Sequence, residues 1–354
     1  MSGTGVQPEP GILTAARKAA DHVPGEPYVT VMMPIRNEAD TLDRTLEAVL
    51  SQDYPAGRME IIVADGMSND GTREILRVIQ QRDPRVRMVD NPGLIVPTGL
   101  NRAVREAKGE ILVRVDGHTI IDRDYVRACV EALKESGADN VGGPMIAEGR
   151  GCFGRAVARA TSSPFGVGGA RFHYSTREEW ADTVYMGAWW RATFDRIGVF
   201  DEGMVRNQDD EFNYRLLEHG GRILLTPRIR SRYTVRGTPG ALWRQYFQYG
   251  YWKVRVMLKH PRQMRLRHFI PALLVATLLG SLLGSAFERR SLLAGAAAAA
   301  LYVTANILVS ARQGMREGLR DIPCLCLAYA ILHLSYGLGF LKGLAVLARR
   351  GERR

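Results

Sequence analysis

Two short polar stretches hold the residues best suited to chemistry, and the first is Asp116-Gly117-His118. It directly follows the apolar run at 111–115, which predicts a buried strand. Side chains two apart on a strand share a face, so the carboxylate and the imidazole should point the same way. Together they could hold a divalent cation that bridges a pyrophosphate and keeps coordination positions open. The alternative is that His118 is only a polar residue of a turn.

The second stretch is Gln208-Asp209-Asp210-Glu211, with three consecutive acids at the start of a predicted helix. The helix dipole favours carboxylates at this end, which explains one or two of them. Three are more than capping requires. A carboxylate held at a rigid helix start could also take a proton from an attacking hydroxyl as a general base.

Two further strand ends carry polar residues suited to binding a base and a ribose. The segment 34–38 (Pro-Ile-Arg-Asn-Glu) closes the first predicted strand, and Asp65 closes the second. The residues that follow, Ser68 to Thr72, are equally well explained as a cap for the next helix. A strand end does not require an acid, so Asp65 is the stronger candidate for function.

The elements that must position these residues alternate in an α/β pattern. β-branched runs predict strands at 28–35, 59–65, 86–90, 110–116 and 139–145, and amphipathic stretches predict helices at 41–52, 72–81, 97–108 and 123–136. This alternation is typical of a mainly parallel sheet flanked by helices. Ligands of such sheets bind beyond the carboxyl ends of the strands, where all three strand-end motifs fall.

The net charge of +11 lies almost wholly in the last part of the chain. Residues 253–354 contain 16 Lys and Arg against 4 Asp and Glu, and they are interleaved with apolar segments. Basic residues in such a place indicate anionic lipid headgroups, and we expect no nucleic-acid partner.

The four cysteines have no metal-type spacing and are expected to be reduced, packed thiols. Residues 1–27 lack the apolar stretch of a secretory signal, which favours a cytoplasmic catalytic domain.

The C-terminal third predicts a membrane region of two or three helices. Residues 239–268 include an amphipathic, basic and aromatic helix that could lie on the bilayer or pack as a buried helix. Apolar segments follow at 269–287, 291–310 and 322–348, and the first two are expected to form a transmembrane hairpin. The third carries His333 and Lys342, so it could cross with a tilt, bend, or enter and return. The basic tail at 349–354 does not decide its orientation.

In combination, these motifs resemble glycosyltransferase family 2, inverting enzymes with the GT-A fold. The resemblance covers roughly residues 28–260: the first two strand ends, Asp116-Gly117-His118 in place of the metal motif DxD, and QDDE in place of an ED motif. Several stretches and the apolar tail are similar to the succinoglycan-type ExoA subgroup. The domains implied are an N-terminal extension (1–27), a GT-A domain (28–238), a juxtamembrane helix (239–268), a transmembrane region (269–348) and the basic tail.

The resemblance also implies roles for individual residues. Asp209 is the expected base, with Asp210 as runner-up, and Asp116 with His118 meets Mg²⁺ or Mn²⁺ and the diphosphate. The donor nucleotide is expected on Pro34, Arg36, Glu38, Asp65, Ser68 and Asp116. The acceptor or its diphosphate is expected near Gly168, Gly169, Tyr249, Trp252 and Lys253, although turns and a packing helix explain these five equally well. His118 and Gln208 depart from the family motifs, each standing where an acid is usual.

The function implied is inverting transfer of a sugar, with a UDP-sugar as the expected donor, to a polyprenyl-diphosphate-linked glycan in exopolysaccharide synthesis. One alternative is a polyprenyl-phosphate acceptor, as in dolichyl-phosphate mannose synthases. Another is a membrane-tethered nucleotide-sugar binder without turnover. The expected location is the inner (plasma) membrane, crossed more than once, with the catalytic domain in the cytoplasm. The sugar, the linkage and the oligomeric state are not specified by the sequence.

Overall fold

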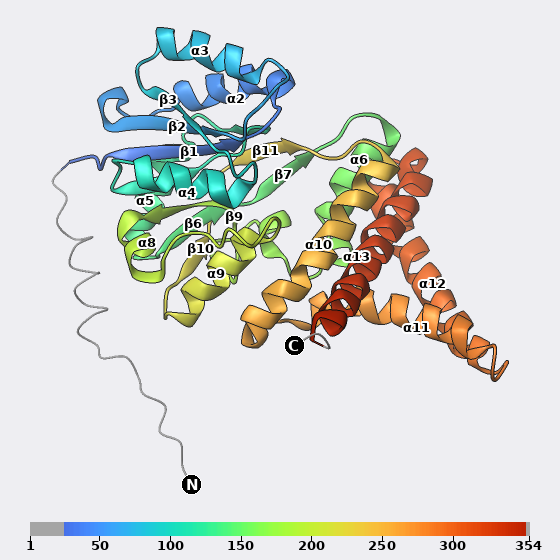
Figure 1. Cartoon of the computed structure of the whole chain (residues 1–354). Helices are drawn as coiled ribbons and strands as arrows, with labels where there is room; N and C mark the ends of the chain where they lie inside the picture. Colours follow the sequence, from blue (N-terminus) through green and yellow to red (C-terminus); the bar gives the residue numbers. More distant parts are fainter. Residues whose placement is uncertain (1–24, 352–354) are drawn as a thin grey trace.

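The computed structural model describes residues 25–351 and contains a mixed α/β domain followed by four long helices (Figure 1). Residues 1–24 of the N-terminal extension and residues 352–354 of the basic tail lie outside the described residues. The main sheet has the strand order β3-β2-β1-β4-β9-β6-β10-β8. Its strands are β1 (Val29–Ile35), β2 (Met59–Asp65), β3 (Val86–Asp90), β4 (Ile111–Arg114), β6 (Asn140–Gly143), β8 (Glu179–Trp180), β9 (Tyr185–Trp190) and β10 (Ile223–Leu225).

All five predicted strands are present as β1, β2, β3, β4 and β6, which confirms the α/β prediction. The sequence did not reveal β9, which lies antiparallel between β4 and β6 and makes the sheet mixed. Trp189 on β9 is 2% exposed and packs edge-on against Phe194, Phe200 and Phe212. This aromatic residue is therefore part of the core. A second, small sheet has the order β5-β11-β7, with β5 (Thr119–Ile121), β7 (Met145–Glu148) and β11 (Ser231–Thr234).

Helices cover both faces of the main sheet. One apolar cluster joins one face of the strands to α2, α3 and α5, and another joins the opposite face to α4, α8 and α9. The helices of this domain are α2 (Ala39–Leu50), α3 (Thr72–Arg82), α4 (Val96–Glu106), α5 (Tyr125–Ser136), α6 (Gly151–Thr161), α7 (Pro164–Val167), α8 (Arg191–Ile197) and α9 (Gln208–Glu218). The four helices predicted between the first five strands are confirmed as α2 to α5.

The strand register brings the predicted motifs to one edge of the sheet. β2, β1 and β4 are neighbours and run parallel, so their carboxyl ends lie together. Asp65 pairs in register with Ile35, and Arg114 pairs with Met32, which places residue 116 level with Pro34. With a strand spacing of about 4.8 Å, the backbones at Asp65 and Asp116 lie about 10 Å apart.

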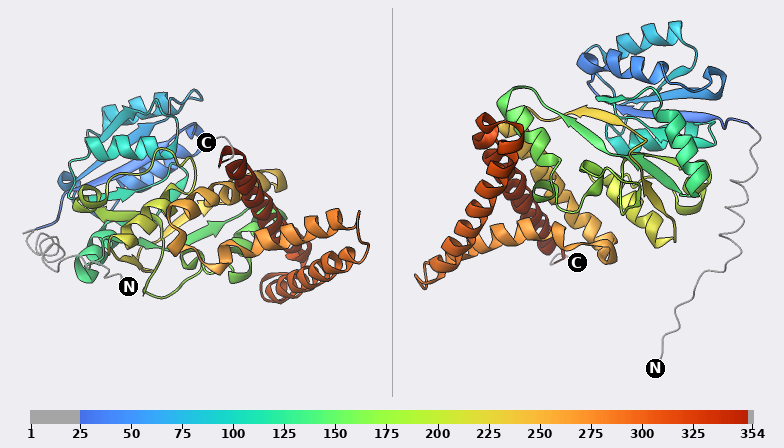
Figure 2. Two further views of the ribbon diagram at one scale, coloured as in Figure 1. Left: turned by 60° about the horizontal axis from the view of Figure 1, so that its bottom comes forward. Right: turned by 180° about the vertical axis from the view of Figure 1, so that it is seen from behind.

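Four long helices form the C-terminal region: α10 (Pro239–Lys259), α11 (Ile270–Gly284), α12 (Ser291–Glu317) and α13 (Ile322–Gly351). They stand to one side of the α/β domain, and the tip of the α11–α12 hairpin points away from it (Figures 1 and 2). Two helical segments are long and apolar enough to cross a membrane, at 291–316 and 319–349. The 15 residues of α11 fall short of the roughly 20 that a spanning helix needs.

The hairpin predicted from the first two apolar segments thus exists, but its first helix is short. The third segment forms one continuous helix, with neither a break nor a return. Half of its apolar window is buried inside the protein, against 11% for α12, because α13 packs along α10 and on α6. The predicted helix at 239–260 is therefore a packing helix, at least along this contact.

Glycines allow α10 and α13 to approach closely. A Cβ atom at Gly250 of α10 would lie 2.0 Å from the carbonyl oxygen of Tyr336, and one at Gly339 of α13 would lie 2.0 Å from that of Phe247. No side chain fits at such distances. Close contact of helix backbones through glycine is a common packing mode of membrane helices.

The prediction of four reduced thiols is wrong for one pair of cysteines. Cys152 at the start of α6 and Cys324 at the start of α13 form a disulfide, with their Cα atoms 6.4 Å apart. The two residues are 172 positions apart, so only the packing of α13 on α6 brings them together. Cys129 and Cys326 are free.

Candidate functional site

Reciprocal hydrogen bonds join the loops that follow β1 and β2. The Asn37 backbone N–H donates to Ser68 Oγ at 2.8 Å, and the Asn69 N–H donates back to Asn37 Oδ1 at 3.1 Å. Asn37 has a left-handed backbone with a φ of 55°. The two predicted donor-binding loops therefore form one rigid surface, in which Pro34 is buried and Arg36 is exposed beside Gly66.

The Asp65 carboxylate is fully buried and already has several partners. It accepts hydrogen bonds from the Ser68 hydroxyl at 2.5 Å and from the Ser68 backbone N–H at 3.1 Å. It also forms an ion pair of 2.6 Å with Arg73 on α3. These contacts fix the loop after β2, and a role of Asp65 toward a nucleoside stays a prediction.

Arg114 of β4 holds the Asp116 carboxylate in a two-point contact. Its Nε and Nη2 atoms lie 2.7 and 3.1 Å from the two carboxylate oxygens. Arg114 is only 4% exposed, and among the described residues its buried Nη1 atom has no hydrogen-bond partner. Asp209 also lies within electrostatic reach of this guanidinium. The buried guanidinium therefore lies near two acids of the predicted site and fixes the carboxylate of Asp116.

His118 lies next to Glu38, so the loop after β1 meets the loop after β4. The His118 Nδ1 atom is 3.1 Å from Glu38 Oε1, and the imidazole is half-exposed. This hydrogen bond raises the pKa of His118 above its ordinary 6.5, although burial of the ring opposes the shift. If Nδ1 donates to Glu38, Nε2 keeps its lone pair available for a metal, an arrangement frequent around metal-bound histidines.

The described residues contain no group of three or more His, Cys, Asp or Glu side chains that could hold a metal by themselves. Asp116 and His118 offer one carboxylate and one oriented imidazole. This pair fits a divalent ion whose other ligands come from a diphosphate and water. The structure brings Asp116, His118 and Glu38 together, and their roles toward a metal and a nucleotide stay predictions.

Asp209 and Asp210, at the start of α9, have environments that separate their pKa values. Burial, followed by the neighbouring Asp210 charge, raises the pKa of Asp209 above 3.8, and Arg114 only partly opposes this. Burial also acts to raise the pKa of Asp210, but its ion pair with the Lys253 ammonium more than offsets this and lowers it. A pair of acids with separated pKa values is typical of sites in which each has its own task. Asp209 is the carboxylate with the greater affinity for a proton.

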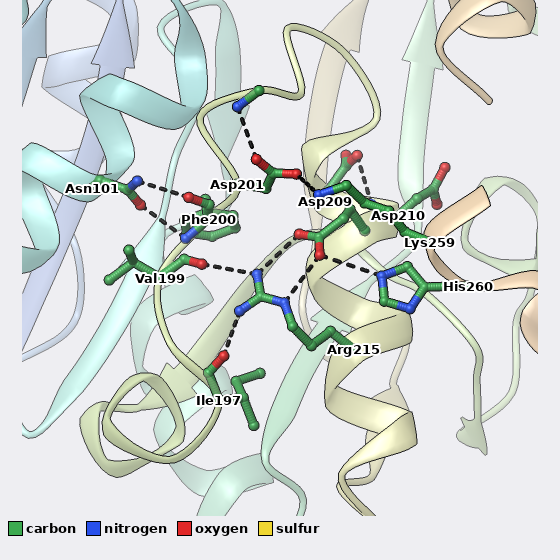
Figure 3. Close-up of polar contacts among 12 residues, drawn as sticks. Asn101, Ile197, Val199, Phe200, Asp201, Asp209, Asp210, Arg215, Lys259 and His260 are labelled. Carbon is green, nitrogen blue, oxygen red and sulfur yellow. Dashed lines mark hydrogen bonds and ion pairs between the residues drawn. The ribbon is translucent and has the colours of Figure 1, made fainter. Parts of the chain in front are cut away.

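A network behind these acids fixes the start of α9 (Figure 3). Arg215, one turn further along, donates to the Val199 carbonyl at 2.8 Å and to the Ile197 carbonyl, and it pairs with Glu211 at 2.9 Å. His260, from the end of α10, lies 3.3 Å from Glu211. Glu211, the third acid of the motif, is therefore structural, while Asp209 and Asp210 are left to face β4 and α10.

The predicted acceptor residues lie in two groups. Tyr249, Trp252 and Lys253 are on α10, where Lys253 is 7% exposed and committed to Asp210. Tyr249 lies near Asp209, whose charge adds to burial in raising the pKa of the Tyr249 phenol. Trp252 stacks under Arg255, whose Cζ atom is 4.4 Å from its ring centre. Tyr249 and Lys253 therefore lie beside Asp209 and Asp210, and the role of all three residues in acceptor binding stays a prediction.

The second group, Gly168 and Gly169, lies in the loop after α7. Gly168 has a φ of +60°, and the Gly169 carbonyl accepts a hydrogen bond of 2.9 Å from Arg267. Arg267 precedes α11 and forms an ion pair of 2.7 Å with Asp182. The loop is thus attached to the connection between α10 and α11.

Sequence reasoning missed the two arginines that hold the acids of this edge, Arg114 and Arg73. The sequence does contain a signal for Arg114, because a charged residue within an apolar strand is rare unless it is paired. Arg73 had none, because an arginine in the first turn of an amphipathic helix is ordinary.

Comparisons with known proteins agree with this geometry. Residues 30–197 match the family model described as glycosyl transferase family 2. The chain is 31% identical over 322 residues to the succinoglycan biosynthesis protein ExoA of Rhizobium meliloti (strain 1021), covering 90% of this chain and 96% of that protein. It is 23% identical over 231 residues to the dolichyl N-acetyl-alpha-D-glucosaminyl phosphate 3-beta-D-2,3-diacetamido-2,3-dideoxy-beta-D-glucuronosyltransferase of Methanococcus voltae, covering 63% and 72%.

A solved structure with a similar fold is the mannosyltransferase PcManGT from Pyrobaculum calidifontis in complex with GDP-Man and Mn²⁺. The TM-score is 0.59 at 21% sequence identity, and the match covers 94% of this chain and 97% of that one. At this identity the comparison establishes the GT-A fold.

Proposed function

The chain belongs to glycosyltransferase family 2 and is similar to a succinoglycan biosynthesis protein and to a transferase named for a dolichyl-linked sugar. We propose that it transfers a sugar with inversion from a nucleotide diphosphate sugar to a polyprenyl-diphosphate-linked glycan. The donor we propose is a UDP-sugar. The observation that carries the proposal is Asp209: a half-buried carboxylate with a raised pKa, next to the Arg114–Asp116 pair at the strand-end edge.

In this reaction each residue of the chain has a defined task. Asp209 takes the proton of the acceptor hydroxyl as that oxygen attacks the sugar carbon opposite the leaving group. Lys253 keeps Asp210 ionised, and the Asp210 charge in turn adds to the proton affinity of Asp209. The Arg114 guanidinium would keep the Asp116 carboxylate in place beside the departing diphosphate. The nucleoside would lie on the joined loops that hold Arg36, Glu38, Asp65 and Ser68.

Asp116 and His118 would hold Mg²⁺ or Mn²⁺, which when bound supplies positive charge against the departing nucleotide diphosphate. Asp116 is fixed for this by Arg114, and His118 by Glu38. The PcManGT complex with GDP-Man and Mn²⁺ supports a nucleotide-sugar donor and a divalent ion. The protein is proposed to sit in the inner membrane, crossing it more than once, with the α/β domain in the cytoplasm.

The direct test is a panel of nucleotide sugars given to the purified, detergent-solubilised protein with a lipid-linked acceptor. Release of nucleotide diphosphate is measured with and without added Mn²⁺ or Mg²⁺. Metal-dependent release from one donor, with transfer to the lipid, is the expected result. Tight binding of a nucleotide sugar without any turnover would instead identify a non-catalytic binder and end the proposal.

Metal affinity should depend on pH through His118. A protonated imidazole cannot bind a metal, so Mn²⁺ affinity in the presence of UDP should weaken as the pH falls through the raised pKa of His118, by roughly tenfold per pH unit. In the variant His118→Asp the weakening should move to lower pH, because a carboxyl group ordinarily titrates near pH 4. Calorimetric titration of Mn²⁺ between pH 8 and pH 5.5 measures this.

The matched control for that titration is His219→Asp, which changes an exposed histidine at the end of α9. Its Mn²⁺ affinity should follow the wild-type pH dependence. Identical curves for wild type and His118→Asp would show that His118 is not a metal ligand.

A further inference from the structure

The α7 segment of the catalytic domain inserts a phenylalanine between two of the C-terminal apolar helices. The Phe165 ring lies edge-on at 4.9 Å from the Tyr329 ring and at 5.1 Å from the His333 imidazole, both on α13. The Tyr302 ring of α12 stacks at 6.5 Å. We call Tyr302, Tyr329 and His333 the aromatic socket.

His333 connects the socket to the backbone of α7. Its Nε2 atom lies 2.8 Å from the Phe165 carbonyl oxygen, and its Nδ1 atom lies 2.9 Å from the Tyr302 hydroxyl. A carbonyl oxygen only accepts, so Nε2 carries the hydrogen and Nδ1 accepts from Tyr302. A histidine within an apolar helix is costly and usually has a task there. One hydrogen bond to Tyr302 would be enough to pair α12 with α13, but the second bond goes to the catalytic domain.

The segment held in this way is connected to a residue near Asp210. Two residues after the end of α7, the Gly169 carbonyl accepts a hydrogen bond of 2.9 Å from Arg267. Arg267 pairs with Asp182 and lies within electrostatic reach of Asp210. The same loop is closed on itself by the Tyr174 hydroxyl, which donates to the Gly168 carbonyl at 2.9 Å. Contacts thus run from α13 through residues 163–169 to Arg267, and from Arg267 an electrostatic interaction reaches Asp210 at the start of α9.

We propose that His333 is a positioning residue for the acceptor: it fixes Phe165, and thereby holds the loop 163–169 where a lipid-linked acceptor meets Asp209. The inference rests on the proposed function, because it assigns this loop to acceptor binding. Its physical basis is that an acceptor anchored in lipid must approach along the apolar helices. A loop fixed to those helices keeps its place relative to both the membrane and the base.

Three substitutions at one position separate the hydrogen bond from simple packing. In His333→Gln the amide nitrogen can take the place of Nε2 and keep the bond to the Phe165 carbonyl, whereas in His333→Asn the shorter amide cannot reach it. His333→Ala removes both bonds. Tyr302→Phe is the matched control, since it deletes the bond to His333 Nδ1, which does not touch the loop, and keeps the ring that stacks on Phe165. Each full-length variant is assayed for the KM of the donor and of the lipid-linked acceptor.

The expected result is a rise of about tenfold or more in the acceptor KM for His333→Ala and His333→Asn, because small displacements of a positioning loop are costly. The donor KM should stay unchanged, and His333→Gln and Tyr302→Phe should resemble wild type. Equal acceptor KM values in all variants, or equal losses for Gln and Ala, would overturn the inference.

Amide hydrogen exchange gives a readout that does not depend on activity. The Gly166 and Val167 amides both donate to the Ser163 carbonyl at 3.1 Å, and they should exchange faster in His333→Ala while the β1 and β2 amides do not change. If the wild-type protein transfers no sugar, the proposed function is wrong. Amide hydrogen exchange would then still show whether His333 holds the loop 163–169. Unchanged exchange at residues 165–169 would refute the positioning role.

Discussion

Replacing Asp209 with Asn is expected to lower kcat for sugar transfer by roughly 10²–10⁴-fold, the usual contribution of a general base. The asparagine amide has the same shape as the carboxylate. Its oxygen can still accept the hydrogen bond of 2.9 Å that the Asp210 backbone N–H donates to Asp209 Oδ1 in the wild-type protein. It cannot take a proton from the acceptor. Donor affinity, measured by titration with UDP and Mn²⁺, should change little, so the loss should lie in kcat.

Asp210→Asn is the matched comparison, since the two acids are adjacent on the same helix turn. It removes the partner of the buried Lys253, and the expected effects are lower stability and a lower pKa at Asp209 with activity retained in part. If Asp210→Asn abolishes transfer and Asp209→Asn does not, the base is Asp210. If Asp209→Asn has only a mild effect, the acceptor is already ionised, as a polyprenyl phosphate would be.

The second large effect is expected from Gly250, where α10 touches α13. In Gly250→Ala the new methyl group would lie about 2.0 Å from the Tyr336 carbonyl oxygen, a backbone atom that cannot turn aside. The helices must separate, at a cost of about 1–3 kcal/mol for overpacking. Because the same helix carries Tyr249 and Lys253 beside Asp209 and Asp210, sugar transfer should fall as well, by tenfold or more.

Gly240→Ala provides the control within the same helix, since a Cβ atom there meets nothing within 4 Å. An alanine in place of this helical glycine should be neutral or stabilise by about 0.5–1 kcal/mol. Thermal unfolding in detergent and the transfer assay compare the two variants. Equal stability and equal activity of both would mean that α10 and α13 are not in backbone contact.

The position of the candidate site in the fold was largely predictable because it follows from local patterns. Strands β1, β2 and β4 are set by β-branched runs, and parallel neighbours necessarily end at one edge. Asp116 and His118 share a face because they are two residues apart. These inferences need only the repeat of a strand and the rule for parallel sheets.

The partners of these residues were not predictable in the same way. Arg114 on Asp116, Glu38 on His118 and Lys253 on Asp210 are chosen by side-chain packing between elements. Lys253 illustrates the difference. The sequence analysis predicted that it binds the acceptor or its diphosphate, whereas in the fold its ammonium group pairs with Asp210, 43 residues away.

The sequence by itself thus determined the α/β class, the family, and which acids and which histidine stand at the strand ends and at the start of α9. Only the tertiary structure decided the placement of β9 within the sheet, the Cys152–Cys324 pair, and the packing of α13 on α10 through Gly250 and Gly339. The physical reason is range. Periodicity and strand ends are properties of neighbouring residues, whereas these contacts join segments tens to more than a hundred residues apart, whose meeting depends on how all the elements between them pack.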